Sequence, residues 1–352
     1  MQADYFSGNQ IASEDNTGYN IVPYGYFTYR HMSDDEIFYF NINNIVENGI
    51  VSTLYPVFTT NIELDSKYLQ YQLNHGYEFA KFARLQKQGG SRTYMYLNKL
   101  KKLRITIPLS VKEQKSISKI LLELDRIITL HQHKYLNATN IKKMSLLKFF
   151  SLLICKLYRQ FTNSWEHRKL GDIADKVTEK NMGLQYIETF TNSAEFGIIS
   201  QKDFFDHDIA KLNSLDGYYI VRDEDFVYNP RISTSAPVGP VNRNKLGKSG
   251  VMSPLYTVFR PHGIDNTYLE YFFKCGHWYS FMNFNGDSGA RADRFSIKDA
   301  VFFQMPIPLP YIDEQIKIGD FFKQLDVLIT LHQRKLEKLQ HIKKACLEKM
   351  FV

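Results

Sequence analysis

The sequence contains one segment twice, and this duplication restricts the possible folds more than any other feature of the chain. Residues 124–132 read Leu-Asp-Arg-Ile-Ile-Thr-Leu-His-Gln, and residues 325–333 read Leu-Asp-Val-Leu-Ile-Thr-Leu-His-Gln, an offset of 201 positions (325 minus 124). At the same offset, residues 49–58 match residues 250–259. Because the matches keep their order along the chain, the sequence predicts two copies of one unit, each a globular domain followed by a long helix.

The two copies are unequal at their starts. The second copy begins near Trp165, whereas Met1 aligns near Ser200, so the first copy lacks a counterpart of residues 165–200. Two explanations are open: the gene begins inside its first domain, or another segment completes that domain.

Length and composition permit two folded domains. A chain of 352 residues fits two domains of roughly 100–200 residues each. The hydrophobic content of 44% and the aromatic content of 14% exclude a disordered chain. The formal net charge of +7 favours polyanionic partners such as nucleic acid.

The sequence predicts a cytoplasmic protein that makes no membrane contact. Its first residues have neither the basic flank nor the apolar core of a signal peptide. The most apolar run, residues 149–155, is shorter than the roughly 20 residues that a membrane span needs. Cys155, Cys275 and Cys346 lie too far apart for a disulfide framework or a zinc pattern, which fits a reducing compartment.

Two long helices are expected, over residues 113–150 and 314–351. In each of them apolar residues recur with 4-3 spacing, which is typical of a coiled-coil seam. The seam positions, which we also expect to dock protein partners, are Ile117, Leu121, Leu124, Ile128 and His131 in the first copy, and Ile318, Phe322, Leu325, Ile329 and His332 in the second. A helix of this length extends about 55 Å, and its seam needs a partner. The obvious partner is the other copy, packed antiparallel about a pseudo-twofold axis.

Two interpretations of the polar seam residues are open. His131 and His332, together with Lys142 and Lys343, either fix the register of the helix pair, as polar seam residues can, or lie at the edge of the seam in water.

The globular segments mix short strands with short helices. Aromatic and β-branched runs broken by Gly, Asn and Asp predict strands at Ile37–Phe40, Ile50–Phe58, Tyr218–Val221, Phe226–Tyr228 and Val251–Phe259. Helical turns are expected at Tyr68–Leu73 and Tyr268–Phe273. The predicted fold class is therefore α+β, with two pseudo-twofold-related mixed α/β domains (residues 1–109 and 161–310) separated by two long antiparallel coiled-coil helices (residues 110–160 and 311–352).

No motif indicates catalysis or a metal site. Residues 246–249, Leu-Gly-Lys-Ser, resemble the end of a P-loop, but Asn242 stands where its first glycine is required. Residues 228–231, Tyr-Asn-Pro-Arg, lack the second proline and the aromatic residue of the adenine methyltransferase motif. The histidines are scattered, and no close cysteine pair offers a metal cage. The chain is expected to be a binding protein without a bound metal.

Basic loops in both copies are candidates for contact with DNA. Glycine lets the backbone approach a phosphate, and Arg can bind a base edge with two hydrogen bonds. The candidate side chains are Lys87, Arg92, Arg231, Arg243, Lys245, Lys248, Arg291 and Arg294. Any one of these loops could be an ordinary solvated loop, but equivalent basic loops at residues 87–94 and 286–294 favour a shared task.

Several motifs, in a fixed order along nearly the whole chain, carry a family resemblance. They are the opening at residues 165–173 (Trp-Glu-His-Arg-Lys-Leu-Gly-Asp-Ile), residues 228–231 followed by Ser-Pro-Leu-Tyr-Thr-Val-Phe at 253–259, and the pairs Glu113-Gln114 and Glu314-Gln315 that lead into each long helix. With this arrangement the chain resembles the specificity subunit of type I restriction–modification systems.

The resemblance implies a division of labour within a larger complex. Each target-recognition domain would read one half of a bipartite site in double-stranded DNA, while the helices set the spacer and dock two methyltransferase subunits. This chain would bind no cofactor. S-adenosylmethionine would belong to the methyltransferase subunits, which methylate adenine, and ATP with Mg²⁺ to the restriction subunits, which cleave DNA.

Two other classes of function compete with this interpretation. A coiled-coil structural adaptor would have no DNA role, and salt-dependent binding to duplex DNA would argue against it. A self-contained DNA methyltransferase or nuclease would show turnover with this chain alone.

Overall fold

The computed structural model describes residues 16–87, 92–151, 165–204, 212–288 and 293–351. Two compact units make up the chain. Unit 1 comprises residues 1–134 and 332–352, and unit 2 comprises residues 135–331.

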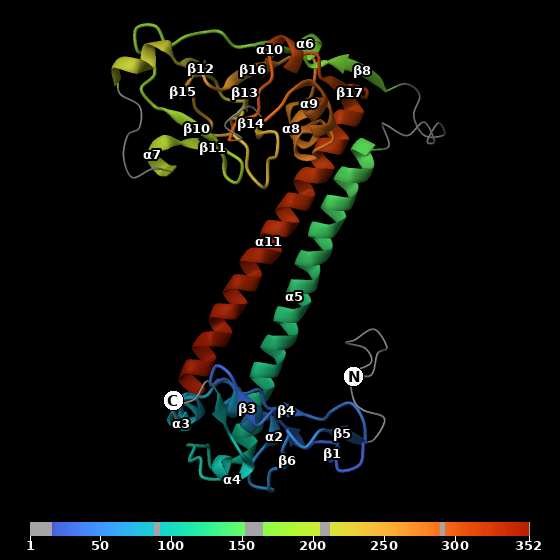
Figure 1. The fold of residues 1–352 in the computed structure, drawn as a ribbon, viewed down its shortest axis with the longest axis vertical. Coiled ribbons are helices and arrows are strands. Elements are labelled where there is room, and N and C mark those ends of the chain that lie inside the picture. The colour runs from blue at the N-terminus through green and yellow to red at the C-terminus, as the bar shows by residue number, and fades with distance from the viewer. Residues whose placement is uncertain (1–15, 88–91, 152–164, 205–211, 289–292, 352) are drawn as a thin grey trace. The chain divides into compact units, whose positions relative to one another are not determined.

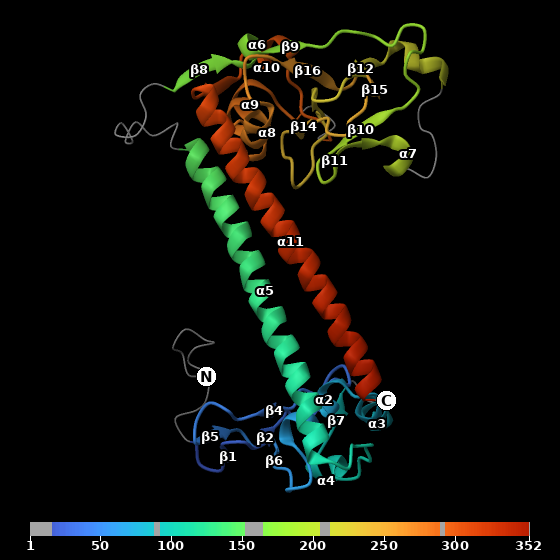
Figure 2. The ribbon, with the colours of Figure 1, turned by 180° about the vertical axis from the view of Figure 1, so that it is seen from behind.

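Both long helices contribute to both units. Helix α5 spans Val111–Ser151 and helix α11 spans Ile312–Met350, within two residues of the ranges expected from the sequence. Because the units divide near residues 134 and 331, each contains a globular domain and a portion of each helix. Within each unit the two helical portions lie side by side (Figures 1 and 2).

The described part of the unit 1 domain contains short antiparallel strands and three short helices. The strands pair as β1-β5, as β4-β2-β6 and as β3-β7. The elements are β1 (Asn20–Pro23), β2 (Phe27–Thr28), β3 (Met32–Ser33), β4 (Asn41–Ile42), β5 (Asn48–Val51), β6 (Val57–Phe58), α2 (Ser66–His75), α3 (Tyr77–Leu85), β7 (Thr93–Tyr94) and α4 (Leu97–Leu100).

The domain of unit 2 repeats this plan and adds to it. Its strands pair as β12-β15, as β14-β13-β16-β9, as β10-β11 and as β17-β8. The elements are β8 (Glu166–Lys169), α6 (Leu170–Ile173), β9 (Ala174–Lys176), β10 (Phe190–Ser193), β11 (Gly197–Ser200), α7 (Gln201–Phe204), the 3₁₀ helix η1 (Leu212–Gly217), β12 (Tyr219–Val221), β13 (Phe226–Tyr228), β14 (Val241–Arg243), β15 (Gly250–Met252), β16 (Thr257–Pro261), α8 (Asn266–Lys274), α9 (Tyr279–Asn285), α10 (Asp299–Phe302) and β17 (Pro306–Leu309).

Equivalent aromatic residues form the centre of each domain. In unit 1 the rings of Phe27 and Phe58 stack with centroids 4.8 Å apart, and in unit 2 the rings of Phe226 and Phe259 stack at 5.6 Å. Three of these four side chains are fully buried. Because each pair joins neighbouring strands in register, the duplication extends from sequence to core packing.

The expected α+β class is confirmed, whereas one expected strand is wrong. Residues 37–40 form no strand, although Phe38 and Phe40 are buried in the core. Side chains of α2 satisfy the backbone there. The Phe40 amide donates to Asn74 Oδ1 at 2.8 Å, and the Phe40 carbonyl accepts from Gln70 Nε2 at 3.0 Å. The run 50–58 contains two strand ends, in β5 and β6, separated by a turn, and the run 251–259 is divided in the same way between β15 and β16.

Candidate nucleic-acid interface

A tyrosine–aspartate–lysine contact fixes the domain of unit 1 to the helix pair. The Tyr71 hydroxyl, on α2, donates to Asp125 Oδ2 on α5 at 2.7 Å. Lys343 of α11 binds the other oxygen of the same carboxylate at 2.5 Å. One carboxylate therefore joins the domain, its own long helix and the long helix of the other copy.

Unit 2 repeats this contact with equivalent residues. The Tyr271 hydroxyl, on α8, donates to Asp326 Oδ2 on α11 at 2.7 Å, and Lys142 of α5 pairs with Oδ1.

The direction of the two long helices follows from their contacts in unit 1. His131 of α5 contacts His332 of α11, and Asp125 of α5 contacts Lys343 of α11. The partner number falls as the α5 number rises, so the helices are antiparallel there.

Buried glutamines hold each short helix at the start of a long one. Gln114 and Gln315 are almost fully buried. Gln114 Oε1 accepts from the Asp65 amide at 2.8 Å, and Gln315 Oε1 accepts from the Asp265 amide at 2.9 Å. Both aspartates are N-caps, of α2 and α8. The Gln of each Glu-Gln pair therefore has a structural role in orienting its domain.

In unit 2, two of the predicted arginines lie on neighbouring backbone segments. Arg231 and Arg294 face each other across an antiparallel bridge, and the Phe295 amide donates to the Pro230 carbonyl at 2.7 Å. A side chain at Gly286 would come within 2.6 Å of the Phe295 ring, so glycine permits this loop to close. Both arginines are exposed, and among the described residues neither guanidinium has an ion-pair partner.

A cavity of about 490 Å³ lies beside this bridge. Arg294, Tyr256 and Tyr219 line it, together with Lys176 and Asp299. Its hydrogen bond with Asp299 raises the pKa of Lys176. A free guanidinium next to aromatic side chains combines groups that bind phosphates with groups on which bases stack.

Arg243 lies in a different environment from Arg231 and Arg294. Its guanidinium pairs with Glu270 at 2.7 Å and Glu224 at 3.2 Å, and its side chain is only 11% exposed. Burial alone would raise the pKa of Glu270, but Lys274 and Lys245 outweigh that effect and lower it to about 2. The carboxylate thus stays charged and holds Arg243 inside the domain, which favours a structural role for this arginine.

The predicted lysines are half-exposed and paired with carboxylates, of which Glu270 is buried. Lys248 binds Glu188 at 2.6 Å in unit 2, Lys87 binds Glu36 at 2.7 Å in unit 1, and Lys245 binds Glu270 at 2.8 Å. Their side chains remain about half exposed, so a phosphate could compete for them. Arg291 lies outside the described residues.

Unit 1 presents aromatic residues where unit 2 presents its arginines. The rings of His31 and Tyr96 stack at 5.0 Å, those of Tyr94 and Tyr96 stack at 6.0 Å, and the Tyr96 side chain is 50% exposed. Arg92, paired with Asp34 at 2.9 Å, precedes this cluster. The sequence reasoning missed His31 and Tyr96. The alternation in Arg-Thr-Tyr-Met-Tyr (residues 92–96) was the available signal, since alternate strand residues share a face.

The sequence model of the family described as type I restriction modification DNA specificity domain matches residues 21–140 and 162–341. The chain belongs to this family. The duplicated domain–helix unit is thus a duplicated specificity domain, and DNA specificity is the role that the family supports, in place of a structural adaptor.

Three known proteins are similar to this chain. It is 24% identical over 308 residues to a candidate type I restriction enzyme specificity subunit, MjaX, from Methanocaldococcus jannaschii; the match covers 80% of this chain and 66%, just under two thirds, of that protein. The S subunit of a type I restriction–modification system from M. genitalium has the same fold, with a TM-score of 0.56 and 14% identity, covering 97% of this chain and 87% of that one. The HsdS subunit from Thermoanaerobacter tengcongensis gives a TM-score of 0.47 at 16% identity, covering 94% and 81%.

The predicted seam positions of this specificity protein are buried or half-buried. Those with at most 8% of the side chain exposed are Leu121, Ile128, His131, Ile318, Phe322 and Leu325. The half-buried ones are Ile117, Leu124, Ile329 and His332. Leu121 packs against Tyr68 and Tyr71 of the unit 1 domain and against Phe351. The seam therefore also contributes to packing that domain against the long helices.

The two seam histidines contact each other in unit 1. The Nδ1 atoms of His131 and His332 lie 3.1 Å apart. Burial, followed by the charges of Lys335, His332 and Lys134, lowers the pKa of His131. One ring must accept the hydrogen bond through an unprotonated nitrogen, so the pair is not doubly charged. This geometry favours the interpretation that the histidines fix the register.

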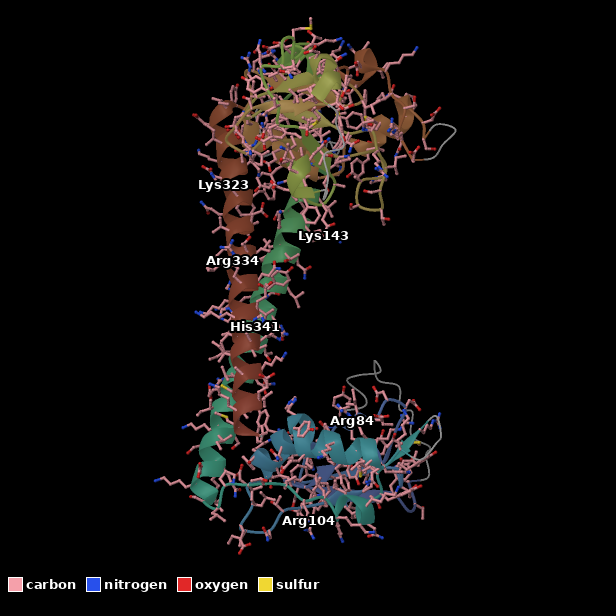
Figure 3. All side chains as sticks on the ribbon, turned by 90° about the vertical axis from the view of Figure 1, so that its left-hand side faces the viewer. Arg84, Arg104, Lys143, Lys323, Arg334 and His341 are labelled. Atoms are coloured by element: carbon pink, nitrogen blue, oxygen red, sulfur yellow. The ribbon has the colours of Figure 1, made fainter. Side chains whose placement is uncertain are left out.

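The long helices of this specificity protein also carry exposed apolar residues that repeat at the offset of 201. Each unit has one set of four, with exposed fractions from 36% to 56%. The set in unit 1 is Ile120, Ile127, Leu130 and Ile342, and the set in unit 2 is Phe321, Leu328, Leu331 and Ile141. We name these sets the helix patches. Charged residues are exposed on the same helices, among them Lys143 and Lys323 in unit 2 and Arg334 in unit 1 (Figure 3).

Neither a metal cluster nor a membrane-spanning helix was found in the described ranges. They contain no group of three His, Cys, Asp or Glu side chains that could hold a metal ion. Cys275 and Cys346 are free thiols, and Cys155 lies outside these ranges. None of the helices described is both long and apolar enough to cross a membrane.

Proposed function

We propose that this chain is the DNA-reading subunit of a type I restriction–modification complex, and that each globular domain reads one half of a bipartite site in double-stranded DNA. The duplication of the domain–helix unit carries this proposal. It extends to the paired contacts Tyr71–Asp125 and Tyr271–Asp326, which fix each domain on a long helix in the same way. Two equivalent domains on a common scaffold suit a target of two separated halves.

In unit 2 the reading surface centres on Arg231 and Arg294. Both are exposed and unpaired among the described residues, and Arg294 lines a cavity with aromatic walls. Lys248 and Lys245 are half-exposed and already paired with Glu188 and the buried Glu270, and both are better suited to phosphates than to bases. In unit 1 we assign the same role to Arg92 with Tyr94 and Tyr96, where stacking contributes more than hydrogen bonding.

The helix patches are the proposed docking surfaces for two methyltransferase subunits. Each unit carries one patch with equivalent residues, which supports two copies of one partner. Apolar side chains inside a charged rim are the usual anatomy of a protein interface. S-adenosylmethionine would bind to the methyltransferase subunits, and ATP with Mg²⁺ to the restriction subunits. This chain alone would catalyse no reaction.

The test of DNA reading is affinity of the assembled methyltransferase complex for cognate and half-site-scrambled duplexes over a salt series. Arg231→Ala and Arg294→Ala should each weaken cognate binding about 5- to 150-fold, since a two-bond Arg–guanine contact contributes about 1–3 kcal/mol of discrimination. Lys248→Ala should weaken both duplexes equally and reduce the salt slope by about one.

Arg243→Ala serves as the control for a structural arginine. It removes two ion-pair contacts of a buried guanidinium, so it should lower the thermal midpoint without selective loss on cognate DNA. Equal losses on both duplexes for Arg231→Ala and Arg294→Ala would mean that these residues only grip the backbone, and would contradict the assigned reading surface.

A further inference from the structure

Two of the residues that line the cavity in unit 2 are aspartates, and their contacts differ. The Asp299 carboxylate accepts hydrogen bonds from Lys176 and from the Thr257 hydroxyl, the latter at 3.1 Å. Asp293 is exposed, and within the described ranges its carboxylate has neither a hydrogen-bond donor nor an ion-pair partner. One carboxylate therefore belongs to the wall of the cavity, whereas the other is open to a ligand.

The fold does not require a charge at the position of Asp293. The Phe295 amide and the Met95 amide donate to the neighbouring strand segment of their units in the same way, each at 2.7 Å. Two residues before each amide, Asp293 of unit 2 corresponds to Thr93 of unit 1, which is uncharged and only 1% exposed. The same backbone pairing thus forms with a buried neutral side chain, so the exposed carboxylate is a feature of unit 2 alone.

The carboxylate stands directly beside a cation that also has no partner. Asp293 precedes Arg294 in the chain, and both line the cavity, yet the described contacts include no ion pair between them. Near DNA a negative charge is repelled by the phosphates. An exposed carboxylate on a DNA-reading surface is therefore unfavourable unless a base offers it a hydrogen-bond donor.

The chemistry of the two side chains limits which base pair suits them. An ionised carboxylate only accepts hydrogen bonds, and a guanidinium only donates them. In the major groove the donors are the amino groups of cytosine and adenine, while guanine presents two neighbouring acceptors, O6 and N7. A C·G pair supplies both sets. An A·T pair supplies the amino group without the two neighbouring acceptors that a guanidinium binds.

We propose that Asp293 determines specificity at one C·G pair of the half-site read by unit 2. Its carboxylate accepts a hydrogen bond from the N4 amino group of the cytosine, and Arg294 donates to O6 and N7 of the paired guanine. This inference rests on the proposed function and names the base pair that the reading surface selects. The carboxylate also disfavours a purely phosphate-bound arrangement of Arg294, because phosphates would then lie beside a negative charge.

Base analogues in duplex DNA separate the two contacts. N4-methylcytosine keeps its pairing with guanine but replaces the amino hydrogen that faces the major groove. Scanned over each cytosine of the half-site whose recognition Arg231→Ala weakens, it should at one position lower the affinity of the assembled methyltransferase complex about 10- to 150-fold, the range for a hydrogen bond to a charged group. With Asp293→Ala this penalty should vanish.

The guanine at the same position tests Arg294 independently. 7-Deazaguanine lacks the N7 acceptor and keeps its pairing. It should weaken binding of the unaltered chain and of Asp293→Ala, but not of Arg294→Ala.

Further variants separate base reading from a structural or phosphate-binding role. Asp293→Ala should bind half-site-scrambled DNA at least as tightly as the unaltered chain, because it removes a negative charge near phosphates. Asp293→Asn keeps an acceptor oxygen without the charge and should show a reduced N4-methylcytosine penalty, since charge-assisted hydrogen bonds are the stronger ones. Asp216→Ala, at an exposed aspartate of η1 that is not among the residues lining the cavity, is the matched control and should keep the full penalty.

Three results would overturn the proposal: a unit 2 half-site without a C·G pair, a full N4-methylcytosine penalty in Asp293→Ala, or equal losses of affinity for cognate and scrambled DNA in that variant. In each case the unaltered complex still distinguishes the two duplexes, so the proposed function stands. If the unaltered complex binds both duplexes equally, the proposed function fails, and the assignment of Asp293 fails with it.

Discussion

Replacing Phe322 with alanine is expected to lower the free energy of unfolding of unit 2 by about 3–5 kcal/mol, the usual cost of truncating a buried phenylalanine. Phe322 is completely buried, and its ring lies 5.1 Å from that of Tyr271. Tyr271 in turn binds Asp326. The cavity would therefore open at the point where the domain is seated on the helix pair.

The measurement is unfolding in urea, monitored by hydrogen exchange of the backbone amides in β13 and β16, which report on unit 2. Leu328→Ala is the matched control because it lies on the same helix with 45% of its side chain exposed; it should change stability by less than about 1 kcal/mol. If Phe322→Ala and Leu328→Ala unfold at the same urea concentration, the burial of the seam is assigned incorrectly.

Charging one helix patch is expected to remove one methyltransferase subunit from the complex and leave the other. Ile127→Glu with Leu130→Glu alters the patch of unit 1, and Leu328→Glu with Leu331→Glu alters that of unit 2. Central apolar anchors each contribute about 2 kcal/mol or more to an interface, so each double substitution should weaken its site by at least about 30-fold. All four side chains are exposed, so folding should be preserved.

Native mass spectrometry of the reconstituted complex counts the subunits. We expect two methyltransferases per unaltered chain, one for either double variant and none for the fourfold variant. Ile62→Glu, on an exposed loop, controls for the added charge. Retention of two subunits by both double variants would place the docking surface elsewhere on the chain.

The sequence predicted the long helices and the repeat well because both are periodic. Apolar seam residues recur every three or four positions along each long helix, and Leu121 and Phe322 occupy equivalent positions 201 residues apart. Their burial therefore follows from the pattern alone. The fold class followed in the same way, since aromatic and β-branched runs such as 226–228 indicated strands directly.

The site was less predictable because its residues are distinguished by their partners. Arg243 and Arg231 both lie in basic loops, and the sequence does not distinguish them as candidates for DNA contact. The fold brings Glu270 and Glu224 to Arg243, whereas it leaves Arg231 exposed. Residues 37–40 have the composition of a strand, but their backbone bonds are taken by side chains of α2, among them Asn74. Such choices depend on contacts between distant segments, which local pattern does not encode.

The most direct test of the central claim is methylation mapping of genomic DNA from cells that carry this gene together with its methyltransferase partner. Recognition by two domains predicts adenine methylation within two short defined elements separated by an unread spacer of constant length. With the Arg231→Ala, Arg294→Ala double variant, the methylated sites should lose their defined sequence in one element and keep it in the other. Methylation at a single uninterrupted motif, or loss of both elements together in that variant, would contradict the assignment of one half-site to each domain.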